Sequence, residues 1–420
     1  MSILINNVLL RGQIVDILIE GNTISKIGKI EPCGRIDHVI NGDKKAAIPS
    51  FINGHTHAAM TLFRGFADDM LLEPWLQEKI WPYETRLTDE YVYWGTRLAC
   101  LEMIKTGTTL FHDMYWHLPA AAQAVADSGI RAVLSTVLIN VAGKKQEELQ
   151  KKLALEALNT QFCSRVRLSV APHAIYTTDA ELLKWGKNLA DKHGLLYHIH
   201  LSETKTEVEN AVKNYGLTPV KYLHSLGVLD KNTVAAHCVW LDNQDIELLA
   251  NAQAKVIHNP NSNMKLSSGI GFRYNDLKKA SVTVGLGTDG CASSNNLDMV
   301  EAMKTASLLC KASFNDPTAM PVQESFDLAT KSGADIFNNR LGRIKEGNLA
   351  DLCLIDLNRP EMIPCHHFLS NLIYASNGNS VDTVICDGQI VMQQRRVKDE
   401  QQILNKATEM AKKIFEGSHE

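Results

Sequence analysis

Residues 166–203 decide the fold of this chain. They read VRLSVAPHA (166–174), TDAELLKWGKNLADKHG (178–194) and LLYHIHLSE (195–203). The first and third segments have the apolar and β-branched content of buried strands, and the segment between them has the pattern of an amphipathic helix that closes on Gly194. A strand, a crossover helix and a second strand predict two parallel strands in one sheet.

The same alternation runs through most of the chain. The other predicted strands are FINGHTHA (51–58), TTLFHDM (108–114), RAVLSTVL (131–138), TVAAHCV (233–239), AKVIHNP (254–260) and VTVGLGTDG (282–290). A helix is expected over 88–107, with Thr88 as its N-cap. Eight strands with connections long enough for helices predict an α/β fold, a (β/α)8 TIM-type barrel over residues 50–346. The rival is a doubly wound open sheet, which would need a glycine-rich phosphate loop that FINGHTHAAM does not provide.

The two ends of the chain predict a second, smaller unit. Short strand signals fill residues 1–48 and return after residue 347, before a predicted terminal helix over 401–417. Neither end has enough strands for a core of its own, because isolated hairpins are marginal in water. We therefore expect residues 1–49 and 347–420 to form one small β-sandwich domain beside the barrel.

Composition narrows the class of protein. The 420 residues include 43 Lys and Arg against 47 Asp and Glu, without a run of like charge, so a nucleic acid or an anionic membrane has no electrostatic support as a partner. The start lacks the basic region and cleavage site of a signal peptide, and no segment is apolar over the length of a membrane span. The nine cysteines are scattered and form no CxxC pair, which favours free thiols in a reducing, cytoplasmic setting.

Histidines lie at the carboxyl ends of the predicted strands, where barrel enzymes build their active sites. His55 and His57 come first, in NGHTHA. Side chains two positions apart on a strand point to the same side, so two imidazoles there can bind one ion. Two histidines separated by one residue more often share a strand face without binding a metal ion. The interpretation of His55 and His57 as metal ligands therefore depends on further ligands from other strands.

His200 closes its strand, and Glu203 follows three residues later. We expect His200 to be the third ligand, with the Glu203 carboxylate near the ion but not bound to it. His198 has the same i, i+2 relation and is the alternative ligand. We choose His200 because it is nearer the strand end and Glu203, and we expect His198 to be packed or hydrogen-bonded.

His237 ends TVAAHCV, and Asp289 ends VTVGLGTDG. An aspartate after a glycine-flanked strand is often a turn residue. In a closed barrel, however, the eighth strand neighbours the first, so Asp289 is expected beside His55 and His57. Three histidines and an aspartate suit a hydrolytic Zn²⁺ site, which Fe²⁺ or Mn²⁺ could also occupy. The fourth strand, VRLSVAPHA, has no lysine or acid to bridge a second ion, so one ion per chain is expected.

These motifs resemble those of the amidohydrolase superfamily. The segments that carry the resemblance are PSFINGHTHAAMTLFRGFADD (49–69), EPWLQEKIWPYE (73–84), LEMIKTGTTLFHDM (101–114), SVAPHAIYT (169–177), IHLSET (199–204), AAHCVWL (235–241), HNPNSNMKLSSGIG (258–271) and GTDGCASSNNLDMVEAM (287–303). The closer match is to the 5-methylthioadenosine/S-adenosylhomocysteine deaminases and their 5'-deoxyadenosine deaminase relatives. Similar barrels deaminate guanine or cytosine or dechlorinate s-triazines, and these activities remain alternatives.

The resemblance implies hydrolytic deamination of the adenine 6-amino group of a 5'-modified adenosine, a small-molecule substrate. It implies that Glu203 shuttles protons, and that His237 hydrogen-bonds the attacking hydroxide or the tetrahedral intermediate. Asp289 or His237 would take the proton from the water. The implied zinc ligands are His55, His57, His200 and Asp289. A barrel that only binds metal is a remote alternative, because it would not need Glu203; the oligomeric state is left open.

The resemblance also implies substrate contacts. Glu84 would accept hydrogen bonds from both ribose hydroxyls, Trp75 would line the nucleoside pocket, and His173 matches a substrate-binding position. On the residues alone, Trp75 and Glu84 would be placed on the surface of a helix, and His173 among packing residues at the barrel rim.

Residues 128–148 depart from the family pattern. Family members that bind a homocysteine group carry arginines here for its carboxylate, whereas this chain has Lys144 and Lys145 and no arginine between Arg131 and Arg165. Lysine lacks the planar bidentate geometry of arginine. Methylthioadenosine or another 5'-modified adenosine is therefore a better supported substrate than S-adenosylhomocysteine.

Overall fold

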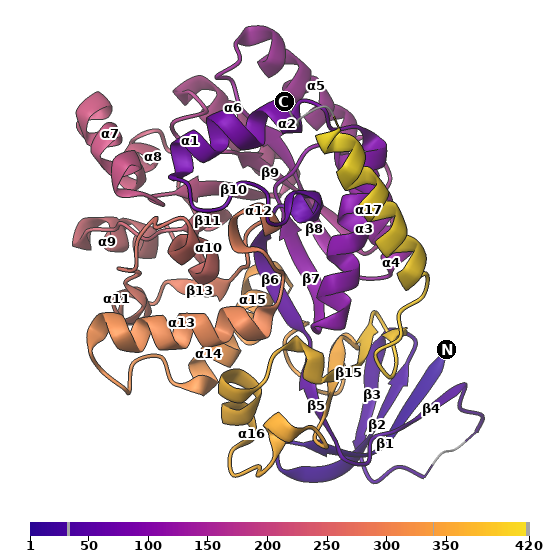
Figure 1. The fold of residues 1–420 in the computed structure, drawn as a ribbon. Coiled ribbons are helices and arrows are strands. Elements are labelled where there is room, and N and C mark those ends of the chain that lie inside the picture. The colour runs from indigo at the N-terminus through magenta and orange to yellow at the C-terminus, as the bar shows by residue number, and fades with distance from the viewer. Residues whose placement is uncertain (32–33, 339, 417–420) are drawn as a thin grey trace.

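The computed structural model describes residues 1–31, 34–338 and 340–416 and shows a barrel beside a smaller β domain (Figure 1). The barrel strands are β6 (Phe51–Thr56), β7 (Thr108–Asp113), β8 (Arg131–Leu138), β9 (Val166–Pro172), β10 (Leu196–Leu201), β11 (Thr233–His237), β12 (Lys255–His258) and β13 (Thr283–Leu286). They lie side by side in chain order, and each pairs in parallel with its neighbour. The eight predicted strands are confirmed.

The barrel closes between β13 and β6. The Thr288 amide donates to Asn53 Oδ1 at 3.0 Å, and Asn53 Nδ2 donates to Thr288 Oγ1 at 2.7 Å. One residue further, the Asp289 amide donates to the His55 carbonyl at 3.0 Å. Sequential strand order with contact between the first and last strands is the topology of a barrel, so the rival open sheet is excluded.

Helices surround the barrel strands (Figure 1). The longer ones are α3 (Asp89–Lys105), α4 (Leu118–Ser128), α5 (Lys144–Leu158), α6 (Ala180–His193), α7 (Lys205–Tyr215), α8 (Pro219–Ser225), α9 (Asn243–Asn251), α13 (Met299–Phe314), α14 (Val322–Ala329) and α15 (Lys331–Phe337). The predicted caps are confirmed: Thr88 Oγ1 accepts from the Tyr91 amide, and Gly194 ends α6 in the left-handed conformation.

Short helical segments lie in the connections that follow β6, β12 and β13. After β6 come η1 (Ala58–Phe63), α1 (Leu72–Pro74), η2 (Trp75–Ile80) and α2 (Trp81–Glu84), and after β12 and β13 come α10 (Pro260–Lys265), α11 (Tyr274–Lys279) and α12 (Cys291–Ser294).

Strands from both chain ends form the β domain. They are β1 (Ser2–Leu10), β2 (Gln13–Glu20), β3 (Thr23–Gly28), β4 (His38–Asn41), β5 (Lys45–Pro49), β14 (Leu352–Asp356), β15 (Val381–Cys386) and β16 (Gln389–Met392). Their order is β16-β15-β14-β5-β1-β2-β3, with β4 also on β1. β5 from one end pairs with β14 from the other, which confirms that the two ends build one domain.

Alternation along β14 lets this strand serve two cores. Leu352 and Leu354 pack into the core of the β domain, whereas Cys353 and Ile355 pack into the main core of the barrel. Successive side chains of a strand point to opposite faces, so one strand joins the two units.

The terminal helix α17 (Glu400–Phe415) packs on the barrel. It runs along α3 in Figure 1 and contacts that helix. Its side chains Ala407, Met410 and Ile414 belong to the main core cluster, and Ile403 is also buried. The segment that leads to it contains η3 (Pro360–Met362), α16 (Phe368–Ser370), η4 (Asn371–Ala375) and η5 (Gly378–Ser380). The domain boundaries 1–49, 50–346 and 347–420 remain predictions.

Eight of the nine cysteines lie in the described residues and are free thiols, as predicted; Cys33 lies outside them.

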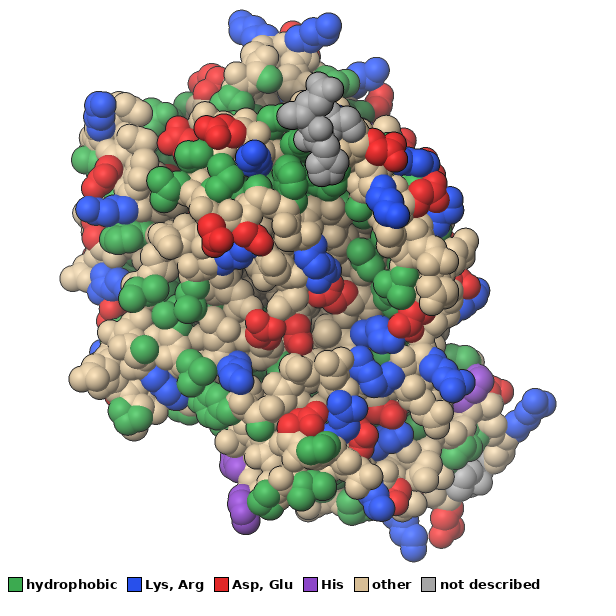
Figure 2. Space-filling view, viewed as in Figure 1, with side chains coloured by type: hydrophobic (Ala, Val, Ile, Leu, Met, Phe, Trp, Pro, Cys, Tyr) green, Lys and Arg blue, Asp and Glu red, His purple; other side chains and the backbone are tan. Residues whose placement is uncertain are grey.

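Among the helices of the described residues, none is long and apolar enough to cross a membrane. Figure 2 shows acidic and basic side chains interspersed over the visible face.

Arg131 joins the barrel to the β domain. Its Nε and Nη2 each donate a 3.1 Å hydrogen bond to the carboxylate of Asp351, whose side chain is fully buried. Nη2 also donates to Asp387 Oδ1 at 2.6 Å. Arg131 is the first residue of β8 and Asp351 immediately precedes β14, so this bidentate pair ties a barrel strand to the neighbouring sheet.

We expect Arg131→Met to lower the free energy of unfolding by about 3 kcal/mol, because it leaves the buried Asp351 carboxylate without its cation. The control is Arg343→Met, which removes an exposed pair with Asp335 and should cost about 1 kcal/mol or less. Urea denaturation of the two variants measures both losses. Equal small losses would contradict a structural role for the Arg131 bridge.

Candidate active site

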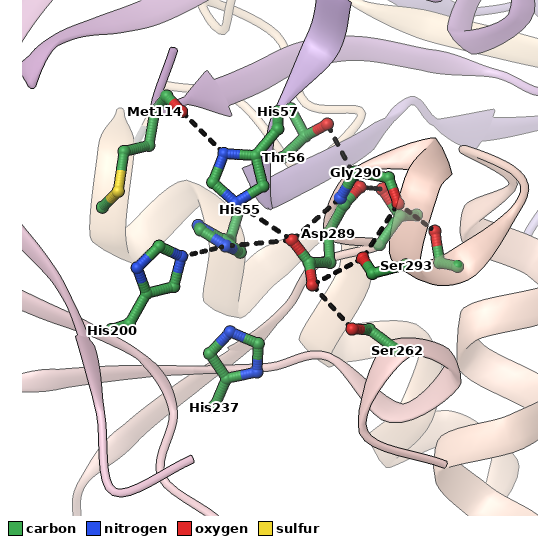
Figure 3. Close-up of polar contacts among 12 residues, drawn as sticks. His55, Thr56, His57, Met114, His200, His237, Ser262, Asp289, Gly290 and Ser293 are labelled. Carbon is green, nitrogen blue, oxygen red and sulfur yellow. Dashed lines mark hydrogen bonds and ion pairs between the residues drawn. The ribbon is translucent and has the colours of Figure 1, made fainter. Parts of the chain in front are cut away.

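The predicted metal-site residues meet at the carboxyl end of the barrel strands (Figure 3). His55 lies in β6 and His57 just after it, His200 lies in β10, and His237 ends β11. Asp289 follows β13 and reaches the same place because the barrel closes. His237 and Asp289 have φ values of +73° and +63°, so the chain turns sharply where each strand ends.

Three ring nitrogens and one carboxylate oxygen converge. His55 Nε2 lies 3.2 Å from His200 Nε2 and 3.4 Å from Asp289 Oδ1. His57 Nε2 lies 3.2 Å from the same Asp289 oxygen. Ligand atoms held about 2.0–2.1 Å from one tetrahedral ion would be separated by about 3.3 Å, so the observed spacing fits a single divalent ion.

Backbone carbonyls orient two of the histidines. His57 Nδ1 donates to the Met114 carbonyl at 2.6 Å, and His200 Nδ1 donates to the His173 carbonyl at 2.8 Å. Because Nδ1 donates in this way, Nε2 is the nitrogen of each ring that would bind a metal ion.

His198 lies behind His55. Its Nε2 is 3.0 Å from His55 Nδ1, and its ring stacks on His112 with centroids 3.8 Å apart. Metal binding through His55 Nε2 would make Nδ1 the donor in this bond. His198 therefore has the hydrogen-bonded role that was expected for it.

Two serines hold Asp289. Its Oδ2 accepts from Ser262 Oγ at 2.6 Å and from Ser293 Oγ at 2.8 Å. Burial acts to raise the pKa of Asp289, but hydrogen bonds with His55 and His57 outweigh it and hold that pKa well below its ordinary value. The group is thus a charged carboxylate, the form that binds a metal.

Glu203 and His237 face each other beside the cluster. Glu203 Oε2 lies 3.8 Å from His237 Nε2, and Glu203 Oε1 accepts from Ser268 Oγ at 3.1 Å. His237 Nδ1 lies 2.8 Å from Asn263 Oδ1, which holds the ring. Burial raises the pKa of Glu203, which favours its protonated form.

His237 also has a ligand atom within 4.8 Å of those of His55 and Asp289. The geometry therefore brings five candidate ligand groups together.

A cavity of about 660 Å³, including its open mouth, covers the cluster. Trp75, Glu84, His173 and Glu203 all line it. Trp75 is only 4% exposed, so the surface position expected from the residues alone is wrong. The segment between β6 and α3 folds over the barrel mouth, which single-strand patterns do not reveal. Aromatic and aliphatic side chains complete the wall, including those of Trp81, Tyr115, Trp116, Val137 and Ile139.

Lys144 and Lys145 lie away from this cavity. They are the first two residues of α5, both are exposed, and neither lines the cavity. Arg131, the arginine of the same segment, is engaged with Asp351.

The family model for amidohydrolases matches residues 46–391, a span that holds every site residue described above. The chain belongs to the amidohydrolase family. A 5'-deoxyadenosine deaminase from Methanospirillum hungatei JF-1 is 46% identical over 399 residues, 91% of this chain and 88% of the relative. The 5-methylthioadenosine/S-adenosylhomocysteine deaminase 1 of Archaeoglobus fulgidus is 44% identical over 399 residues, 94% of each chain.

A solved structure supports membership of the amidohydrolase family. An adenosine deaminase from Xanthomonas campestris, with zinc bound, superposes with a TM-score of 0.91 at 32% identity and covers 98% of each chain. This amidohydrolase thus has the barrel and the additional β domain predicted for it, and a cluster of histidines and an aspartate suited to a divalent metal ion.

We expect the purified amidohydrolase to contain about one divalent ion per chain, because the converging ligand atoms fit one ion. His200→Ala should lose most of it, while His193→Ala, an exposed position at the end of α6, should keep it. Elemental analysis of the two variants measures the difference. Unchanged metal in His200→Ala would move the third ligand elsewhere, with His198 as the first candidate and His237 as the second.

Proposed function

We propose that this amidohydrolase removes the adenine 6-amino group of 5'-modified adenosines by hydrolysis, which yields an inosine-type nucleoside and ammonia. One observation carries the proposal: a metal-type cluster, the buried Glu203 and a cavity lined by Trp75 and Glu84 meet at one site. The 46% identity to a 5'-deoxyadenosine deaminase and the 44% identity to a 5-methylthioadenosine/S-adenosylhomocysteine deaminase support this substrate class.

The proposed metal is Zn²⁺, held by His55, His57, His200 and Asp289. Nitrogen and oxygen ligands with room for one water suit a hydrolytic zinc site, although Fe²⁺ and Mn²⁺ accept the same set. A bound zinc ion lowers the pKa of a water molecule from 15.7 to about 7 and so supplies a nucleophile for C6 at neutral pH.

Burial raises the pKa of Glu203, the direction that favours a proton donor. Its carboxyl delivers a proton to ring N1 as the attacking oxygen makes C6 tetrahedral. His237, held by Asn263, hydrogen-bonds the attacking oxygen, and Asp289 or His237 takes the proton from the water. A second proton transfer to the 6-amino group lets the C6–N bond break, and ammonia leaves.

The remaining residues of the cavity suit a nucleoside. The Glu84 carboxylate offers two acceptors for the ribose diol, and Trp75 offers an aromatic face to the substrate. Burial lowers the pKa of His173 to about 3, so the ring is neutral and can bind an uncharged base or sugar edge. Guanine, cytosine and s-triazines have no ribose diol for Glu84, which disfavours these alternatives. Glu203 beside the cluster disfavours a barrel that only binds metal.

Glu203→Gln separates binding from chemistry. The variant should keep its metal and bind substrate, while kcat falls by about 10²–10⁴, the usual contribution of a positioned acid or base. Elemental analysis and steady-state kinetics measure the two effects. Loss of the metal would make Glu203 a ligand, and near-normal turnover would remove it from the mechanism.

Specificity should follow the acidic and aromatic character of the cavity wall. Among the described residues that line it there is no lysine or arginine, so a homocysteine carboxylate gains little. We expect kcat/KM for methylthioadenosine and 5'-deoxyadenosine to equal or exceed that for S-adenosylhomocysteine, with guanine and cytosine inert. A 2'-deoxy analogue should lose about 1–3 kcal/mol because one Glu84 oxygen is left unpaired.

Ammonia release from these compounds, measured side by side, tests that order. Strong turnover of guanine would contradict the nucleoside assignment. A large preference for S-adenosylhomocysteine would mean that Lys144, Lys145 or a neighbouring subunit reaches the substrate carboxylate.

A further inference from the structure

Glu207 is a buried carboxylate that the chemistry above does not use. It lies in the first turn of α7, and only 6% of its surface is exposed. A buried acid without a cation beside it is costly unless its oxygens accept strong hydrogen bonds. The groups that donate hydrogen bonds to the Glu207 carboxylate therefore indicate its role.

Each Glu207 oxygen accepts one backbone amide of the loop that carries Glu203. Oε1 accepts from the Ser202 amide at 3.0 Å, and Oε2 accepts from the Glu203 amide at 2.7 Å. In an ordinary capping box, an acid at this helix position reaches the amide of the N-cap residue, which here is Thr204. Glu207 instead reaches past Thr204 to the two residues before it.

These two amides need a partner that the barrel does not provide. β10 ends at Leu201, and Ser202 has a φ of +50°, in the left-handed region that non-glycine residues rarely adopt. The Ser202 carbonyl accepts from the amides of Val239 and Trp240, both at 3.0 Å. The loop after β11 thus holds the carbonyl side of Ser202, and Glu207 holds the amide side.

We propose that Glu207 is a positioning residue for Glu203: its carboxylate fixes the peptide from which the Glu203 side chain extends toward His237 and the substrate. The inference rests on the proposed function, because it takes Glu203 as the group that moves protons. Two hydrogen bonds from Glu207, of 3.0 and 2.7 Å, fix the backbone on both sides of the peptide that carries Glu203, which holds its side chain in the geometry that proton transfer requires.

Glu207→Gln tests the proposal with little change in size. The amide side chain keeps one acceptor oxygen and turns a nitrogen donor toward the other backbone amide. We expect kcat to fall about 10- to 100-fold, as for other outer residues that orient a working group, while KM and metal content change by less than about twofold. The control is Glu209→Gln, an exposed acid of the same helix paired with Lys205, which should leave kcat unchanged.

The decisive comparison repeats the substitution in the Glu203→Gln background. A residue that acts only by placing the Glu203 carboxyl should there lower the remaining kcat by less than about twofold. The proposal would be overturned if Glu207→Gln lowered kcat by the same factor in both backgrounds. Loss of metal from Glu207→Gln would also overturn it, because Glu207 would then act on the position of the metal ligand His200.

Thr204→Ala provides a second route if Glu207→Gln folds poorly. Thr204 Oγ1 accepts from the Glu207 amide at 3.0 Å, so its removal loosens Glu207 without changing the carboxylate. A smaller fall in kcat that disappears in the Glu203→Gln background supports the proposal, and an equal fall in both backgrounds overturns it. If the wild-type enzyme were inactive on 5'-modified adenosines, the proposed function would be contradicted. If the wild type were active and Glu207→Gln were fully active as well, only the inference about Glu207 would be contradicted.

Discussion

Closure of the barrel between β13 and β6 is the constraint on which the site depends. Asp289 and His55 are far apart in the chain, yet the amide of one donates to the carbonyl of the other at 3.0 Å. This contact brings a carboxylate from the last strand against imidazoles from the first. Without it, the chain would hold histidine pairs with no carboxylate from the last strand beside them.

Buried polar groups in the site are tolerated because most of them have a second partner. The carbonyls of Met114 and His173 orient imidazoles, serines hold Asp289, and Glu207 holds the peptide of Glu203. Such partners offset the cost of removing these groups from water, and they fix the orientation of each side chain that they contact.

The barrel strands and the polar residues at their ends were largely predictable, because both leave local signals. Apolar runs separated by helical periodicity identified all eight barrel strands. In the structure, His200 Nε2 lies 3.2 Å from His55 Nε2, whereas His198 Nε2 contacts His55 Nδ1. Trp75 was misplaced on the residues alone, because its burial comes from the way a short segment folds over the barrel mouth. No periodicity records that contact.

The sequence by itself determined which residues end the parallel strands, since strand period and turn residues act over a few neighbouring positions. Tertiary structure alone decided which partners those residues meet. Asn263 against His237, Ser262 against Asp289 and Glu207 against the Glu203 amide are contacts made by loops and helix starts. Their geometry depends on backbone turns such as the positive φ of Ser202, and it exists only once the barrel has closed and each loop has been packed against the next.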